Sequence, residues 1–439
     1  MRRNITNNKA AFLKYEIREI VDVVQKLKEI DPRFQAVGEN IGDPIAKGWR
    51  VPRFLKEILV EEIRHEEDTA FGYAHSRGNP QVRKWVVELS KKLCPMSTLD
   101  YEYVLFTNGL GAAIASLYQM MPGGARYLEP SPTYPSHASM ESFNAGEEPL
   151  FYKLNPHNHW EPDLDHMESQ IKAHPEVAGV VVISPNNPTG AVYSRGTLES
   201  IVRLAEKYGL MILADEIYFR MVYNGHTFVH LTELAQGRVP LIVMRGVSKD
   251  VPWPGGRSGW IEFHNVDLDE SYRNYCEGVK KRVLLEVCSV HLPQAVLPRF
   301  YDHPEFPEWN RKYNAELERN GNTIAEILGS VDGLMVNRPN GAFYVMPLFR
   351  EGLLNEQQTL PIGNAEARRY IEEEVARPGT APDKRFAYYL LASTGICVVP
   401  ATGFYSAHQG FRVTTLERNP QKLRDTYTQL AAAIRTYTR

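Results

Sequence analysis

Residues 241–260 decide the fold and read LIVMRGVSKDVPWPGGRSGW. The run from Leu241 to Met244 is apolar throughout, which predicts a strand buried on both faces. Lys249 follows this strand, and Arg257 lies beyond a bend rich in proline and glycine that cannot be an ordinary helix. A lysine on a rigid turn beside apolar side chains loses its proton more easily than in water, which would make Lys249 a nucleophile. The alternative is an ordinary surface lysine on a loop.

The same strand-then-polar-residue pattern occurs at three other places in the chain. Amphipathic helices separate the strands, which predicts an α/β fold with a mostly parallel sheet covered on both faces. Ligands of such sheets lie beyond the carboxyl ends of the strands, so the polar residues should converge there. The four pairs are 103–107 with Asn108, 179–183 with Asn187, 210–214 with Asp215, and 241–244 with Lys249.

At 439 residues the chain exceeds what one hydrophobic core usually spans, so two unequal parts are expected. We expect a large domain over residues 51–295 and a smaller α+β domain that combines residues 1–50 with residues 296–439. The smaller domain begins with a helix predicted from Ala11 to Glu29. Its strand-like runs are 341–346, 395–400 and 411–414, and the charged stretch 350–385 is predicted to be a surface insertion.

Composition excludes several classes of function. Hydrophobic residues make up 43% of the chain and charged residues 23%, which are ordinary globular values. A net charge of −3, from 50 basic and 53 acidic residues, gives no reason to expect nucleic acid or a membrane as partner. The four cysteines lack C-x-x-C spacing, so we expect no metal site. No signal segment or membrane-spanning run is apparent, and a cytoplasmic location is expected.

The polar residues after the strands could together bind a phosphorylated ring. The turn that contains Leu110 and Gly111 opens a helix, whose free N–H groups would bind an anion together with Arg257. Asp215 could face a protonated ring nitrogen, and Tyr218 and Asn187 could donate to a ring oxygen. Each residue alone has an ordinary structural explanation, as a turn, a helix cap or a core side chain. Together they form the set that pyridoxal 5′-phosphate requires.

Three motifs resemble the signature of the class I/II aminotransferases, which have fold type I of the pyridoxal-phosphate enzymes. They are SPNNPTG at 184–190, ADEIY at 214–218, and the Ser248-Lys249 pair followed by Arg257. The resemblance extends from Gly42 to Arg412, and the motifs occur in the order and spacing of that family.

The resemblance implies a role for each cofactor-binding residue. Lys249 would form the internal aldimine and move a proton between the substrate Cα and the cofactor C4′. Asp215 would hold the pyridine nitrogen protonated, and His137 would contact Asp215 on the side away from the cofactor. The remaining implied contacts are Tyr218 and Asn187 at the ring O3′, Tyr134 on the ring face, and Arg257, Ser248, Leu110 and Gly111 around the phosphate.

The resemblance also implies how substrate and a second subunit take part. Arg412 matches the arginine that binds the substrate α-carboxylate, together with Asn187, and Gly42 lies in the loop above it. The alternative for Arg412 is a surface arginine on a strand. Tyr73 would reach the phosphate bound by a neighbouring subunit, which implies a homodimer with shared active sites. Ser131-Pro132 and Asn187-Pro188 resemble the cis peptides of the family.

Three departures from the family pattern are apparent. Gly246 replaces a phosphate-binding serine, for which Ser248 could compensate, and Ala401 replaces a glycine. The bend 250–254 is unusually bulky and could shape substrate access. No second arginine for a dicarboxylate side chain is apparent, so aspartate specificity is not supported.

Transamination between an L-α-amino acid and a 2-oxo acid is the leading hypothesis. Elimination or replacement, cyclisation, and oxidation use the same cofactor and remain alternatives. A third hypothesis is a non-catalytic ligand-binding homologue, against which the intact Lys249 argues.

Overall fold

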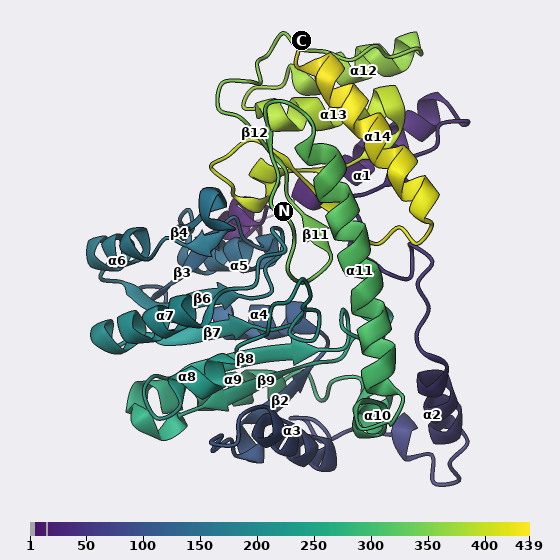
Figure 1. Cartoon of the computed structure of the whole chain (residues 1–439). Helices are drawn as coiled ribbons and strands as arrows, with labels where there is room; N and C mark the ends of the chain where they lie inside the picture. The colour runs from purple at the N-terminus through teal and green to yellow at the C-terminus, as the bar shows by residue number, and fades with distance from the viewer. Residues whose placement is uncertain (1–4, 15) are drawn as a thin grey trace.

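A computed structural model describes residues 5–14 and 16–439. At its centre lies a sheet of eight strands in the spatial order β2-β9-β8-β7-β6-β3-β4-β5 (Figure 1). Adjacent strands from β8 to β4 are parallel, whereas β9 is antiparallel to both its neighbours and β5 is antiparallel to β4. The predicted mostly parallel sheet is therefore confirmed. The strands are β2 Val104–Thr107, β3 Arg126–Ser131, β4 Leu150–Asn155, β5 Glu161–Pro162, β6 Val177–Ile183, β7 Met211–Asp215, β8 Leu241–Gly246 and β9 Gly259–His264.

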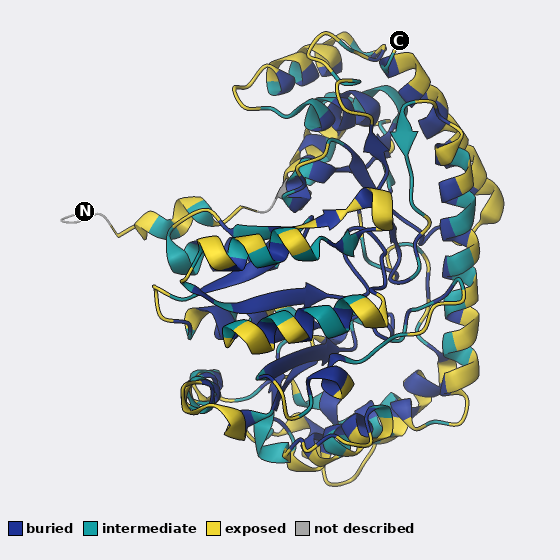
Figure 2. Ribbon diagram, turned by 60° about the vertical axis from the view of Figure 1, so that its left-hand side comes forward, coloured by how far each residue is buried: buried dark blue, intermediate teal, exposed yellow. Residues whose placement is uncertain are grey.

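Helices cover both faces of this sheet because successive side chains of a strand point to opposite faces. In β6, Val180 and Val182 pack with α6, α7 and α8. Val181 and Ile183 of the same strand pack with α4 and α9 on the other face. Figure 2 shows the strands buried and the outer turns of the helices exposed. The covering helices are α4 Leu110–Gln119, α5 Pro135–Ala145, α6 Leu164–Ala173, α7 Arg195–Tyr208, α8 Leu231–Ala235 and α9 Glu270–Leu284.

A smaller α+β part packs beyond one end of the sheet and combines both ends of the chain (Figure 1). Its strands are short, and β1 from the N-terminal segment pairs in parallel with β13. The prediction that the N-terminal segment joins the C-terminal third is thus confirmed. The elements are α1 Glu16–Ile30, β1 Val37–Gly38, β10 Leu334–Met335, β11 Tyr344–Val345, β12 Leu348–Phe349, α12 Ala365–Val375, α13 Pro382–Thr394, β13 Ile396–Cys397, β14 Val399–Pro400, β15 Phe411–Thr414 and α14 Pro420–Tyr437.

The helix α11, Phe306–Gly329, runs from the edge of the large sheet to the smaller part (Figure 1). Before it, α10, His291–Tyr301, packs with α2, Arg53–Ile63, and α3, Pro80–Leu93, in one apolar cluster. The boundary expected at residue 295 falls within α10, and the domain division stays a prediction. Across the described residues, no helix has the length and apolar character needed to cross a bilayer.

Three elements differ from expectation. The first α-helix begins at Glu16 rather than Ala11, because residues Asn8–Phe12 form a separate 3-10 turn. The strand β9 was not predicted, since Glu262 and His264 interrupt its apolar run. The stretch 350–385 is more than a surface insertion, because α12 buries Ile371 and Val375 in the core of the smaller part.

Candidate active site

A cavity of about 620 Å³ opens at the carboxyl ends of the parallel strands, against the smaller part. Most of the site residues predicted from the sequence line it, so segments distant in the chain converge as expected. They are Gly42, Leu110, Gly111, Tyr134, Asn187, Asp215, Tyr218, Ser248, Lys249, Arg257 and Arg412. Among the predicted residues, His137 and Tyr73 lie outside the cavity wall.

Lys249 projects into the cavity from the loop after β8. Its Nζ donates a hydrogen bond of 3.0 Å to the carbonyl oxygen of Gly42 and lies 5.5 Å from the ring centroid of Phe343. A Cβ atom on Gly42 would collide with the hydroxyl of Tyr344, so the loop can approach this closely only with glycine there. The lysine therefore faces a cavity wall of backbone and aromatic groups, and it is not a surface lysine.

The bend 250–254 follows Lys249 directly in the chain and contributes little to the cavity wall. Of its residues only Pro254 lines the wall. Asp250 is 0% exposed, accepts two 3.1 Å hydrogen-bond contacts from the Tyr301 hydroxyl, and lies 3.3 Å from Arg220 Nε. Asp250, Val251 and Pro252 are buried, so Pro254 is the residue of the bend at the cavity, and an influence of the bend on substrate access stays a prediction.

Asp215 ends β7, and its carboxylate is held by two donors. Oδ1 accepts a 3.1 Å hydrogen bond from the backbone N–H of Ile217, and Oδ2 lies 3.2 Å from Nε2 of His137. Asp215 is only 3% exposed and His137 is fully buried. A buried carboxylate that retains lone pairs toward a cavity is suited to a cationic or N–H partner there.

Tyr218 presents a neutral hydroxyl to the cavity. Its oxygen lies 3.2 Å from the hydroxyl oxygen of Tyr344, and burial raises the pKa of Tyr218 well above its usual range. The phenol therefore stays protonated and can donate a hydrogen bond. Tyr344 was not predicted as a site residue, because it lies in the strand-like run 341–346, where an aromatic side chain is typical of a core.

An anion site lies where α4 begins. Gly109 precedes the helix with φ of 79°, and a Cβ atom there would lie 2.6 Å from Nη2 of Arg257. The Arg257 guanidinium donates to the carbonyl oxygens of Pro254 and Asn108, each at 3.2 Å. Across the described residues, no carboxylate lies within ion-pair distance of Arg257. Its charge and the first N–H groups of the ten-residue helix are thus available to an anion.

Gly246 leaves no room for a serine at this position. A Cβ atom there would lie 2.8 Å from the carbonyl oxygen of Ser258 and 3.0 Å from Cα of Gly259. Ser248 lines the cavity, and its role at a bound phosphate stays a prediction.

Arg412 is buried on β15 and has no carboxylate partner among the described residues. It is 3% exposed, and its guanidinium carbon lies 4.4 Å from the ring centroid of Tyr344 and 4.7 Å from that of Phe404. Nη1 donates to Oδ1 of Asn187 at 3.1 Å and Nη2 to the carbonyl oxygen of Asn40 at 2.6 Å, while Nε has no partner. The alternative of a surface arginine is therefore wrong, and the buried charge calls for an anion in the cavity.

Asn40 contributes a backbone carbonyl, which no side-chain pattern in the sequence could reveal. Tyr73 is 87% exposed and is not among the residues that line the cavity of its own chain. The two cis peptides expected from the sequence, Ser131-Pro132 and Asn187-Pro188, are both present, and Ser184-Pro185 is a third that was not predicted.

Comparisons with known proteins find relatives over nearly the whole chain. The chain is 42% identical to an uncharacterized aminotransferase of Methanocaldococcus jannaschii, over 99% of both chains. It is 30% identical to the glutamate-pyruvate aminotransferase AlaA of Escherichia coli K12, over 76% of this chain and 80% of the relative. A solved alanine aminotransferase from Pyrococcus furiosus superposes with a TM-score of 0.83 at 24% identity, covering 97% of this chain and 99% of that one.

The family model described as aminotransferase class I and II matches residues 46–426 of the chain. An aminotransferase from Escherichia coli superposes with a TM-score of 0.84 at 25% identity over the whole of both chains. The chain belongs to the class I and II aminotransferases and is a transferase.

Proposed function

We propose that the enzyme transfers the amino group of an L-α-amino acid to a 2-oxo acid with pyridoxal 5′-phosphate bound in the 620 Å³ cavity. One observation carries the proposal. Lys249, Asp215 and Arg412, from three distant parts of the chain, line one cavity, and they supply an amine, a buried carboxylate and an unpaired buried cation. These groups match the three demands of the reaction, which are an amine for the cofactor aldehyde, an acidic partner for its ring nitrogen and a partner for the substrate carboxylate.

The cavity fits the cofactor by the chemistry of its donors. Arg257 and the N-terminal N–H groups of α4 form a site for the phosphate, and Ser248 lies beside them. Asp215 lines the cavity, and its oxygens keep lone pairs for the pyridine N–H beside the contacts with Ile217 and His137. Tyr218 and Asn187 supply donors for the ring hydroxyl. When bound, pyridoxal 5′-phosphate supplies an aldehyde for amines and a ring that withdraws electrons.

Lys249 has two tasks in this proposal. Its Nζ would hold the cofactor at its aldehyde, and as a free amine it would take the proton from the substrate Cα. The hydrogen bond from Nζ to the Gly42 carbonyl shows that the side chain is long enough to reach the roof of the cavity.

Arg412 orients the substrate. Its guanidinium is clamped between Tyr344 and Phe404, and Asn187 holds one edge, so its direction is fixed before substrate arrives. A planar carboxylate matches the two parallel N–H bonds that a guanidinium offers. Among the described residues of the cavity wall, the cations are Lys249, Arg257 and Arg412. In this proposal they serve the cofactor aldehyde, the cofactor phosphate and the substrate α-carboxylate. A second substrate carboxylate would thus meet tyrosine and asparagine rather than arginine.

The homodimer remains part of the proposal. Apolar side chains are exposed close to the anion site, on two neighbouring segments. The segments contact each other through His291, whose Nδ1 lies 3.2 Å from the carbonyl oxygen of Gly72, and Val290 N–H donates to Oδ1 of Asn108 at 2.9 Å. A second copy of the chain that covers this patch would bring Tyr73 to the neighbouring phosphate site. The exposed apolar residues are Phe71, Tyr73, Leu284, Leu285, Val287 and Val290.

The test is a half-reaction. Purified enzyme loaded with pyridoxal 5′-phosphate is mixed with single amino acids, and conversion to the pyridoxamine form is followed by absorbance. Alanine and glutamate come first in the panel, because relatives are named for glutamate-pyruvate and alanine transamination. Conversion by an amino acid, with formation of its 2-oxo acid, supports the proposal. Release of a leaving group or consumption of oxygen, without the pyridoxamine form, would instead indicate elimination or oxidation.

A cytoplasmic location stays a prediction.

A further inference from the structure

A chain of hydrogen bonds leads from Asp215 away from the cavity into the core. Nε2 of His137 lies 3.2 Å from Oδ2 of Asp215, and Nδ1 of His137 lies 3.0 Å from the hydroxyl oxygen of Tyr118. The same hydroxyl oxygen lies 2.8 Å from Oε1 of Glu129. His137 and Glu129 are 0% exposed and Tyr118 is 1% exposed, so the chain ends on a carboxyl group without access to water.

Glu129 lies on β3, and among the side chains that the structure describes no cation is within ion-pair distance of it. Thr133 Oγ1 lies 3.5 Å from its second oxygen. Arg126 on the same strand is bound by Glu141 through two hydrogen bonds and is not within ion-pair distance of Glu129. Burial raises the pKa of Glu129 well above its usual range, against the smaller opposite influence of Tyr118. The titratable groups around the Glu129 carboxyl are Tyr118, Arg126, His137, Glu141, Tyr152 and Tyr405.

With Asp215 ionised, the single hydroxyl proton of Tyr118 allows two arrangements. If Glu129 is ionised, Tyr118 donates to it and must accept from Nδ1 of His137. A donor at Nε2 toward Asp215 then requires a doubly protonated imidazolium. If Glu129 keeps its proton, it donates to the Tyr118 oxygen, Tyr118 donates to Nδ1, and a neutral His137 donates from Nε2 to Asp215.

Both arrangements hold the same number of protons and differ only in where the charges lie. The first places charges on Glu129 and His137, which are both 0% exposed, in addition to the charge on Asp215 at the cavity wall. The second leaves a single charge, on Asp215. Each buried ion carries a desolvation cost of several kcal/mol, so the second arrangement is favoured.

We propose that Glu129 stays protonated and acts as a positioning residue for Asp215. It directs the Tyr118 hydroxyl to Nδ1 and so fixes His137 as the neutral tautomer that donates from Nε2. Asp215 then stays an anion that accepts a hydrogen bond from a neutral imidazole. Because no positive charge on His137 offsets it, the full negative charge of Asp215 acts on the ring nitrogen. This consequence at the ring rests on the proposed cofactor, whereas the proton arrangement does not.

The test uses Glu129→Gln, whose amide donates to Tyr118 as a protonated glutamate does. The protein is labelled with ¹⁵N-histidine, and the tautomer of His137, assigned with a His137→Asn variant, is measured by NMR without added cofactor. We expect a neutral Nε2–H tautomer in both wild type and Glu129→Gln at neutral pH. A doubly protonated His137 in the wild type that becomes neutral in Glu129→Gln would overturn the proposal, because it would show that Glu129 is ionised.

Tyr118→Phe provides the second arm, because it removes the donor to Nδ1. Its matched control is Tyr152→Phe, which also removes a buried hydroxyl, one that lies on β4 and donates to the Val181 carbonyl rather than to His137. We expect Tyr118→Phe, and not Tyr152→Phe, to abolish the single-tautomer spectrum and to shift the pH titration of the bound cofactor's absorbance. We also expect it to lower kcat roughly ten-fold, the effect of one lost hydrogen bond in a chain that ends on a charged group.

An unchanged His137 spectrum in Tyr118→Phe would refute the role of the chain. If the protein fails to bind pyridoxal 5′-phosphate at all, the proposed function fails, but the NMR arm still decides the proton arrangement.

Discussion

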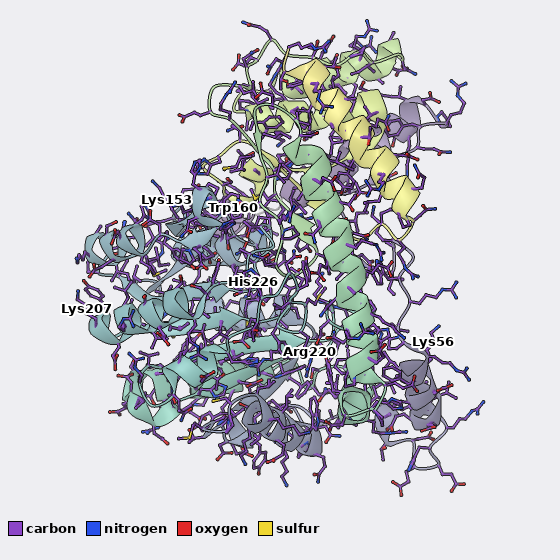
Figure 3. The ribbon with its side chains drawn as sticks, viewed as in Figure 1. Lys56, Lys153, Trp160, Lys207, Arg220 and His226 are labelled. Carbon is purple, nitrogen blue, oxygen red and sulfur yellow. The ribbon has the colours of Figure 1, made fainter. Side chains whose placement is uncertain are left out.

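Replacing Asp250 with asparagine is expected to change how the free energy of unfolding depends on pH. Asp250 is the residue after Lys249 and is 0% exposed. Arg220, which lies beside the lower end of α11 (Figure 3), has its Nε 3.3 Å from the carboxylate but without hydrogen-bond geometry. Burial raises the pKa of Asp250 from 3.8 to about 6, in spite of Arg220 and the Tyr301 hydroxyl. The desolvation of this carboxylate therefore outweighs its contacts.

The direction of the effect follows from proton binding. Between the unfolded pKa of 3.8 and the folded pKa of about 6, the folded protein keeps a proton that the unfolded chain has released. The free energy of unfolding therefore falls as pH rises through this range. A shift of about two units corresponds to about 3 kcal/mol lost above pH 6, at 1.36 kcal/mol per unit. About 2 kcal/mol of this contribution to the free energy of unfolding is lost between about pH 4.5 and about pH 7.

Urea unfolding of wild type and Asp250→Asn, at several pH values and constant ionic strength, measures this contribution. Because asparagine does not titrate, the stability of wild type relative to the variant should fall by about 2 kcal/mol from about pH 4.5 to about pH 7. Asp267→Asn is the control, since that side chain is 95% exposed. A difference that rises with pH would refute the reasoning, because it would show that the ion pair with Arg220 outweighs burial.

Three further substitutions test the site. Arg412→Lys should raise KM for the amino acid roughly 10- to 100-fold, with cofactor affinity unchanged, because lysine cannot form the paired hydrogen bonds to a carboxylate; steady-state kinetics and a cofactor titration decide this. Gly246→Ser should destabilise the fold by about 1–3 kcal/mol through overlap with the Ser258 carbonyl, seen as a lower urea midpoint. Tyr73→Phe should weaken cofactor binding roughly ten-fold in the dimer, by loss of one phosphate hydrogen bond, and an unchanged Kd would count against a shared site.

The residues that line the cavity could be predicted because the chemistry is concentrated directly after strands. Asn187, Asp215 and Lys249 each follow an apolar run, and parallel strands end at a common edge, so order along the chain implied proximity in space. The mostly parallel sheet followed from the same runs. The roles of these residues remain predictions, because geometry alone does not show a reaction.

What could not be predicted depends on contacts between distant segments. The strand β9 carries Glu262 and His264 into the core because Arg245 pairs with Glu262 at 2.7 Å across the sheet, a compensation that no local pattern reveals. Likewise, Asn40 enters the site through its carbonyl oxygen, and Tyr344 was indistinguishable from a core aromatic residue.

The pairing of β1 with β13 has a consequence for synthesis of the chain. The segments proposed to hold the cofactor lie between Leu110 and Arg257 and leave the ribosome well before β15. The substrate side needs Asn40 and Gly42 from the beginning of the chain to meet Arg412 near its end, and β1 cannot dock until β13 has been made. A nascent chain thus acquires the parts that bind cofactor before those that select a substrate, and amino-acid recognition is a property of the finished polypeptide.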